Sequence, residues 1–165
     1  GQEPDMIQRL QDEDALPTQL YLSTNASDYE SFLRINKPKY DDSWERWNKT
    51  LNILKDLDTR TVLRITLIRN YNDQKEMIPA FAEMFRKTSP HFIEIKSYMH
   101  IGRSTNRLEY SNMLEMEEIK DFSKQVAKQS GIFSIMDESF VSRIVVLQNN
   151  HRFTDRWIPT YFETT

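Results

Sequence analysis

The segment from Thr61 to Ile68 constrains the fold more than any other part of this sequence, because nearly every position in it is β-branched or apolar. A half-exposed strand alternates apolar and polar residues, whereas a strand of a buried parallel sheet is apolar almost throughout. Arg64 is the only charged residue in this run. The segment therefore predicts a central parallel strand in a sheet that is covered by helices.

Further strands and helices are expected to alternate on both sides of this segment. Strands that alternate with helices favour parallel βα units, and several in succession favour a barrel or part of one. The predicted class is α/β, a partial (β/α) barrel of about five mostly parallel strands over residues 1–150, with an irregular tail over 151–165. The expected strands are 19–24, 61–68, 92–99, 132–136 and 143–147, with helices over 4–11, 28–35, from residue 43, through 77–85 and from 116 to the stop at Gly131.

Each of the first three strands divides into an apolar face and a more polar face, because side chains alternate along a strand. In the strand over 92–99, Ile93 and Ile95 share one face, and Glu94 and Lys96 share the other. Burying such charged groups without partners is very costly, so the polar faces predict the lining of a polar cavity. The candidate site residues near the carboxyl ends of these strands are Ser23, Asn25, Arg64, Thr66, Lys96 and Tyr98.

A second interpretation of the same charges stays open. Arg64, Glu94 and Lys96 lie on neighbouring expected strands, where they can pair with one another as a buried network.

Composition excludes several kinds of site. The chain has no Cys among its 165 residues, so it holds no disulfide, Cys nucleophile or thiolate-bound iron–sulfur cluster of its own. The three His residues lie too far apart in the sequence to suggest a metal site, and a net charge of -3 predicts no particular partner. With no long apolar run and no signal peptide, we expect a cytoplasmic protein without a membrane partner.

Several ordered sequence blocks are similar to those of a known enzyme family. They are LPTQLYLS (16–23), NKP (36–38), DSWER (42–46), RTVLRITL (60–67), FIEIK (92–96), GRS (102–104), NM (112–113) and EEI (117–119). Their order and spacing resemble those of the wybutosine-synthesising radical S-adenosylmethionine enzymes over nearly the whole chain. Several ordered blocks are far more specific than one short motif.

The resemblance implies a partial (β/α) barrel and a reaction that condenses pyruvate carbons with N1-methylguanosine of phenylalanine tRNA to form 4-demethylwyosine. The family uses S-adenosylmethionine and a 4Fe-4S cluster, which a CxxxCxxC loop holds in the first third of the barrel. This sequence has no such loop, and its start resembles the point just after the family's third strand. The resemblance thus implies the C-terminal part of a carbon–carbon bond-forming lyase that is catalytically incomplete as given.

Two further expectations come with the resemblance. Eukaryotic members commonly carry an FMN-binding flavodoxin-like domain upstream, which makes FMN a further candidate cofactor of the longer protein. The strand over 19–24 is expected to expose an unpaired edge where the missing strands would lie, which predicts self-association through that edge.

The resemblance also implies roles for the residues at the strand ends. Ser23 and Asn25 follow the strand that resembles the family's LYVS segment, where an Asp is more usual in the place of Asn25. Arg64 and Thr66 match the family's RxT, and these four residues are expected on the S-adenosylmethionine side of the site. Lys96 is similar to the Lys of the family's IEIK block, where it would hold the carboxylate of pyruvate or, alternatively, form an imine with its ketone.

Basic residues gather in or beside the loops after the first three strands, at the face where a tRNA loop would enter. Tyr40, Tyr71 and Tyr110 lie in the same loops, and such rings can stack an unpaired base. Because loops are generally rich in Lys and Arg, solvated surface is an equally good interpretation for any one of these cations. The expected RNA-binding residues are Lys37, Lys39, Arg46, Arg69, Arg103 and Arg107.

A hypothesis from a different functional class competes with the enzyme. In it, the chain is a non-catalytic relic that keeps half of the barrel as an RNA-binding or protein-binding module.

Overall fold

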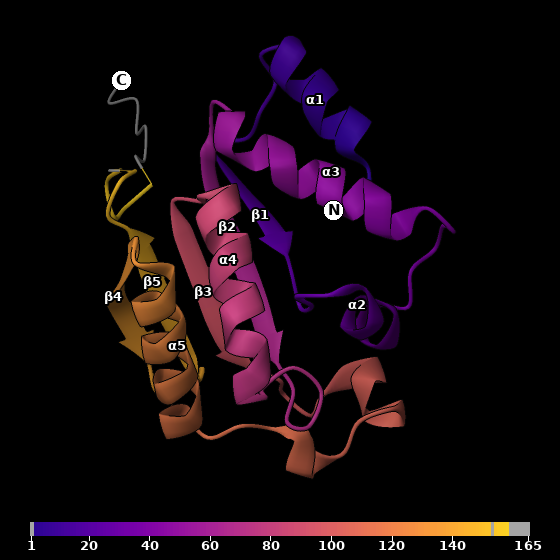
Figure 1. The fold of residues 1–165 in the computed structure, drawn as a ribbon, viewed down its shortest axis with the longest axis vertical. Helices are drawn as coiled ribbons and strands as arrows, with labels where there is room; N and C mark the ends of the chain where they lie inside the picture. The colour runs from indigo at the N-terminus through magenta and orange to yellow at the C-terminus, as the bar shows by residue number, and fades with distance from the viewer. Residues whose placement is uncertain (1, 153, 159–165) are drawn as a thin grey trace, which may run out of the picture.

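The computed structural model describes residues 2–152 and 154–158, and it has a central five-stranded sheet with helices packed against it (Figure 1). The mixed α/β class predicted from the sequence is confirmed. The strands are β1 (Gln19–Ser23), β2 (Arg60–Leu67), β3 (Phe92–Ser97), β4 (Phe133–Ser139) and β5 (Ile144–Asn149). The helices are α1 (Pro4–Asp12), α2 (Tyr29–Asn36), α3 (Ser43–Ile53), α4 (Ile78–Thr88) and α5 (Met116–Ser130), with short 3-10 helices at Leu54–Asp56, Lys75–Met77, Gly102–Asn106 and Tyr110–Asn112.

The order of the strands in the sheet is β1-β2-β3-β5-β4. The neighbours β1, β2 and β3 are parallel, as expected of successive βα units. That expectation is wrong for β5 alone, which runs antiparallel to both β3 and β4, so that β4 points in the same direction as β1 to β3. The reason is the turn over 140–143, which is long enough for a hairpin, whereas a parallel crossover needs a dozen or more residues.

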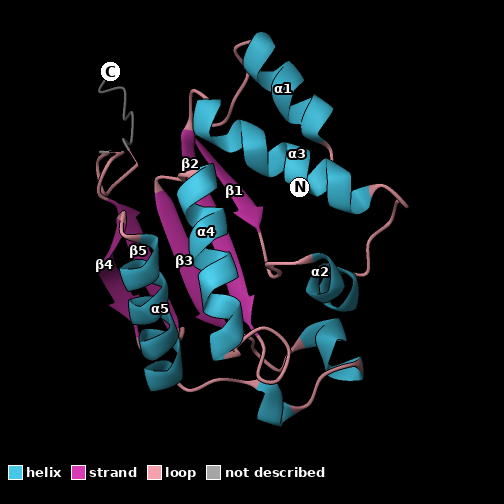
Figure 2. Ribbon diagram, viewed as in Figure 1, coloured by secondary structure: helices cyan, strands magenta, loops and turns pink. Residues whose placement is uncertain are grey.

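One face of the sheet forms the hydrophobic core. Helices α4 and α5 lie in front of this face in Figure 2, and α3 adds its own apolar residues to the same cluster. Ile65 and Ile93 on the sheet and Phe81 and Phe85 on α4 are 0% exposed. Phe81 also meets the ring of Phe122 from α5 edge to face, with their centroids 5.9 Å apart. Full burial of one such side chain contributes about 1.5–3 kcal/mol, so this layer holds the strands in register.

The opposite face of the sheet is partly open. Tyr21 on it is 47% exposed, and Arg64, Thr66 and Lys96 are half-buried. This is the polar face that strand alternation predicts, and it carries the predicted site residues Arg64, Thr66 and Lys96.

Two sequence expectations concern the ends and the surroundings of the chain. The predicted tail over 151–165 lies partly outside the described residues, and its described part, 151–152 and 154–158, contains no helix or strand. Among the helices of the described residues, none is long and apolar enough to cross a membrane.

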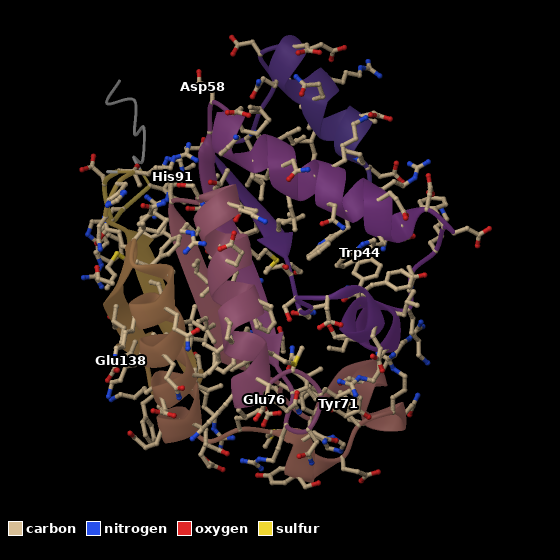
Figure 3. All side chains as sticks on the ribbon, in the orientation of Figure 1. Trp44, Asp58, Tyr71, Glu76, His91 and Glu138 are labelled. Atoms are coloured by element: carbon tan, nitrogen blue, oxygen red, sulfur yellow. The ribbon has the colours of Figure 1, made fainter. Side chains whose placement is uncertain are left out.

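The amino-terminal ends of β2 and β3 are joined through a half-buried imidazole, that of His91. His91 precedes β3, at the end of the sheet opposite to Tyr71 (Figure 3). Its Nδ1 lies 3.1 Å from the backbone nitrogen of Thr61, whose N–H donates to it. Burial, and secondarily the charges of Arg152 and Arg60, lower the pKa of His91 from 6.5 to about 4. The neutral ring is therefore the form that the folded chain favours.

We expect His91 to make the folded state sensitive to acid. Its folded pKa is depressed, so the unfolded chain binds the proton more readily, and stability present above pH 6.5 is lost as pH falls toward about 4. In urea titrations, His91→Asn should flatten this dependence of the free energy of unfolding on pH, because Asn offers an acceptor that does not titrate. His151→Asn, at an exposed side chain, should retain the wild-type dependence; the same pH profile in both variants would contradict the assignment.

Candidate functional site

One buried amide joins the carboxyl ends of β1 and β2. The side chain of Asn72 is 0% exposed, and its Oδ1 accepts the backbone N–H of Ile68 at 2.7 Å. Its Nδ2 donates to the backbone oxygens of Asn25 at 2.8 Å and Thr66 at 3.0 Å. The Oδ1 of Asn25 in turn accepts the N–H of Thr66 at 2.8 Å. These bonds fix where the two chain segments leave the sheet.

Sequence reasoning did not select Asn72. Its signal is weak, since an Asn soon after a buried strand most often indicates a turn. In the structure the loop folds back on the strand that precedes it, which only the path of the chain reveals.

A cavity of about 350 Å³ opens at the carboxyl ends of β2 and β3. Five of the predicted functional residues line it together: Asn25, Thr66, Lys96, Tyr98 and Arg107. Thr66 and Lys96 are register partners on adjacent strands. Within the described residues, the Lys96 ammonium has no hydrogen bond and no ion pair. The wall of the cavity thus combines apolar side chains with hydrogen-bonding groups, and the positive charge of Lys96 on it is uncompensated.

Tyr98 also borders this cavity, but its side chain is only 5% exposed. Its hydroxyl forms a hydrogen bond of 3.0 Å with Nδ1 of His100, and its ring packs in a small cluster with Ile68, Leu108 and Met113. Tyr98 therefore holds the loop after β3 against the end of the sheet.

Arg64 is held by a carboxylate on the neighbouring strand. Its Nε and Nη2 donate to the two oxygens of Glu94 at 2.8 and 3.1 Å, and its guanidinium lies 4.6 Å over the ring of Tyr21. The bond to Glu94 also raises the pKa of Arg64. The paired-network interpretation is therefore right for Arg64 and Glu94 and wrong for Lys96. Ser23, the register partner of Arg64, is exposed and does not line the cavity.

The predicted RNA-binding residues fall into separate groups. Lys37 and Arg107 line a second cavity, of about 330 Å³, and Arg103 is exposed in the 3-10 helix that precedes Arg107. Arg69 donates to the backbone oxygen of Ser111 at 2.9 Å and is paired with Glu118.

Lys39 and Arg46 lie apart from both cavities, in a cluster around Tyr40. Their cationic groups lie 4.7 and 4.8 Å from the centroid of its ring. Arg46 also pairs with Asp42 at 2.9 Å and with Glu3 at 3.6 Å. The charge of Arg46 is therefore paired with carboxylates, whereas Lys39 contacts the ring and the hydroxyl of Tyr40.

The described residues contain no group of His, Asp or Glu side chains arranged to hold a metal ion. A cavity of about 400 Å³ nearer the amino ends of the strands, beside Arg60 and Phe92, is lined by none of the predicted site residues.

Comparison with known proteins connects this architecture to one family. A family model described as "Wyosine base formation" matches residues 87–149. The S-adenosyl-L-methionine-dependent tRNA 4-demethylwyosine synthase of Pyrococcus abyssi is 37% identical over 150 residues, which are 91% of this chain and 43% of that protein. The Methanocaldococcus jannaschii protein of the same name is 41% identical over 150 residues, 90% of this chain and 44% of that protein. This chain belongs to the tRNA 4-demethylwyosine synthase family.

A solved structure of the family has the same fold. The one described as "Structure of TYW1 with a lysine-pyruvate adduct bound" superposes with a TM-score of 0.75 at 41% identity, over 86% of this chain and 44% of that one. The chain thus spans less than half the length of the synthases that it matches.

The names of these synthases imply S-adenosylmethionine as a cofactor of the family. A 4Fe-4S cluster, which the sequence resemblance also implies, needs thiolate ligands. The residues of this chain do not fit that group, because they include no Cys.

We expect Asn72→Ala to weaken this synthase-family fold markedly. The change removes three hydrogen bonds and leaves buried backbone groups at the ends of both strands without partners, at a cost of about 2–4 kcal/mol in the free energy of unfolding. Urea denaturation measures the loss. Asn52→Ala, at an exposed position of α3, should change stability by less than about 0.5 kcal/mol; equal effects at the two positions would contradict the role of Asn72.

The Arg64–Glu94 pair should show coupling in a double-mutant cycle. Arg64→Met removes the guanidinium that pairs with the carboxylate of Glu94, a residue that is 8% exposed. We expect the free energy of unfolding to fall by about 1–3 kcal/mol, after allowance for the partial exposure of Arg64. The double variant Arg64→Met with Glu94→Leu should recover part of it. Losses that simply add would show that the pair contributes nothing beyond its separate side chains.

Proposed function

We propose that this chain forms the C-terminal part of a tRNA 4-demethylwyosine synthase, which condenses pyruvate carbons with N1-methylguanosine of phenylalanine tRNA. The observation that carries the proposal is the uncompensated ammonium of Lys96 in the cavity at the carboxyl ends of β2 and β3. Parallel sheets bind their ligands at this edge, and the relatives that match nearly the whole chain bear this name.

In this proposal Lys96 binds the carboxylate of pyruvate. A half-buried ammonium without an ion pair suits a small anion, and Thr66, its register partner, offers a hydroxyl to the same ligand. The structural relative with a lysine–pyruvate adduct supports lysine–pyruvate chemistry in the family. Because the match spans 44% of that chain, the adduct by itself does not assign the imine to Lys96.

Asn25 and Thr66 border the same cavity and would face S-adenosylmethionine. When bound, that cofactor would supply the radical chemistry of the reaction. The side-chain oxygen of Asn25 is already taken by the Thr66 N–H, so Asn25 mainly fixes the strand end, while the Thr66 hydroxyl is presented to the cavity. Arg64 and Ser23 would act less directly, since Arg64 is committed to Glu94.

The remaining expectations fit the same proposal. The parallel strands β1, β2 and β3 form one part of a partial (β/α) barrel, and their polar face lines its interior. The cluster ligands, and an FMN domain where one occurs, would come from a region outside this chain, so we expect the chain alone to form no 4-demethylwyosine. Within the described residues β1 has a neighbouring strand, β2, on one side only. Its other edge would pair with that region or with a second copy of the chain.

The tRNA would approach the same edge of the sheet. Lys37, Arg103 and Arg107 are exposed there without ion pairs to the described residues. Arg69 lies nearby, and its charge is paired with that of Glu118. Lys39 and Arg46 would contact RNA only on the separate surface around Tyr40.

Binding of pyruvate tests this function. We expect wild-type chain to bind pyruvate, and Lys96→Met to weaken binding at least about tenfold, as loss of one charge-assisted contact predicts. Lys96→Arg should restore most of it, because the ion pair survives. Lys124→Met, an exposed Lys on α5, is the matched control. Calorimetry or broadening of the pyruvate methyl resonance measures the affinity.

The possible outcomes separate the hypotheses. Retention of pyruvate on Lys96 after borohydride reduction would replace the carboxylate role by the imine role. RNA binding without any pyruvate binding would favour the non-catalytic module, and the absence of both at low salt would overturn the proposed function.

A further inference from the structure

A second cavity adjoins the Lys96 cavity at the carboxyl edge of the sheet. The two share four lining residues, so they are two lobes of one depression: Ile35, Ile68, Arg107 and Leu108. The rest of the second lobe is lined by Arg34, Lys37 and Tyr71. We call it the cationic lobe, because Arg34, Lys37 and Arg107 line it and no carboxylate does.

The three cations come from two segments that are distant in the sequence. Arg34 lies in the last turn of α2, and Lys37 follows the helix in the left-handed conformation, with φ 45°. Arg107 lies in the loop after β3. Cations near a helix C-terminus complement the helix dipole, which accounts for Arg34 and Lys37 separately. It does not account for Arg107, which the fold brings to the same cavity.

Arg34 is fixed in place by Tyr71. Its Nη2 donates to the Tyr71 backbone oxygen, and its guanidinium lies 5.3 Å from the centroid of the Tyr71 ring. One face of that ring is therefore covered by Arg34 and is not available to stack a base. Figure 3 shows Tyr71 at the end of the sheet near the loop after β3. Its role in the lobe is to orient a cation.

No carboxylate of the described residues neutralises the positive charge of the cationic lobe. Within the described residues Arg34, Lys37 and Arg107 form no ion pair, and Lys96 in the adjoining lobe forms none either. Three like charges around one cavity repel one another, and an anion bound among them removes that cost. The floor of Ile35, Ile68 and Leu108 is apolar, which suits the carbon skeleton next to a charged group rather than a fully hydrated ion.

We propose that the cationic lobe binds one backbone phosphate of the RNA, the phosphate attached to the nucleotide whose base enters the Lys96 cavity. The shared wall of the two lobes is the basis for this assignment, since a base and its own phosphate must lie in adjacent spaces. The inference rests on the proposed function. It adds Arg34 to the RNA-binding residues and assigns a different role to each lobe. The Lys96 lobe meets the reacting groups, and the cationic lobe holds the backbone in register.

The salt dependence of RNA binding tests the number of phosphates. The probe is the anticodon stem-loop of phenylalanine tRNA with N1-methylguanosine in place, and the variants are Arg34→Met, Lys37→Met, Arg107→Met and their combination. Each phosphate neutralised contributes about 0.7–0.9 to the slope of log K against log salt. Because the three cations share one phosphate, we expect the triple variant to lower the slope by about 0.7–0.9 in total. A decrease of about 2 or more would mean separate phosphates and overturn the proposal.

A neutral linkage in the RNA tests which phosphate is bound. Methylphosphonate at the linkages flanking N1-methylguanosine should weaken wild-type binding about as much as the triple variant does, and it should leave the triple variant nearly unaffected. Equal weakening of both proteins would sink the assignment. Arg9→Met, on the exposed surface of α1, is the control for general loss of positive charge, and thermal melting checks that each variant is folded.

Two further outcomes keep the proposals apart. If wild-type chain does not bind the stem-loop even at low salt, the RNA-directed function itself fails. If inorganic phosphate binds in a manner that the triple variant abolishes, while RNA binding is the same in wild type and triple variant, the lobe is a site for a free anion and the proposed link to the RNA backbone is wrong.

Discussion

The site depends on the buried side chain of Asn72. Its amide makes three hydrogen bonds that join the segments leaving β1 and β2, and so it fixes the positions of Asn25 and Thr66. Buried backbone groups at strand ends must find partners, and water cannot reach these. One amide that both donates and accepts satisfies several of them at once. The walls of both lobes start from the strand ends that the Asn72 side chain holds in place.

The open face of the sheet shows how a polar interior is kept stable. Arg64 and Glu94 face each other in register and satisfy each other through a bidentate pair, while Tyr21 covers the guanidinium. A charge without such a partner is costly unless water or a ligand reaches it. Lys96 lies nearer the carboxyl edge, where the cavity opens, and is the charge on this face that a ligand can use. The difference between the two cations is one of position on the sheet.

The depression at the carboxyl edge combines different chemistry in its two lobes. In the proposed function Lys96 and Thr66 would bind a small anion, whereas Arg34, Lys37 and Arg107 line the other lobe beside an apolar floor. A tRNA-modifying enzyme must grip the backbone and the reacting base together, because holding one positions the other. In the proposed function, residues from α2 and its C-terminal end, β2, β3 and the loop after β3 would do this together.

The sequence by itself determined the α/β class, the parallel strands β1 to β3, the apolar and polar faces of the sheet, and the family. These properties follow from the period of side chains along strands and helices and from ordered sequence blocks, which are local in the chain. Only the tertiary structure decided the antiparallel hairpin of β4 and β5, the commitment of Arg64 to Glu94, the roles of Asn72 and Arg34, and the separation of Lys39 and Arg46 from the cavities. The physical reason is that a side chain's partners depend on which distant segments the fold brings beside it, and local patterns carry no information about those distances.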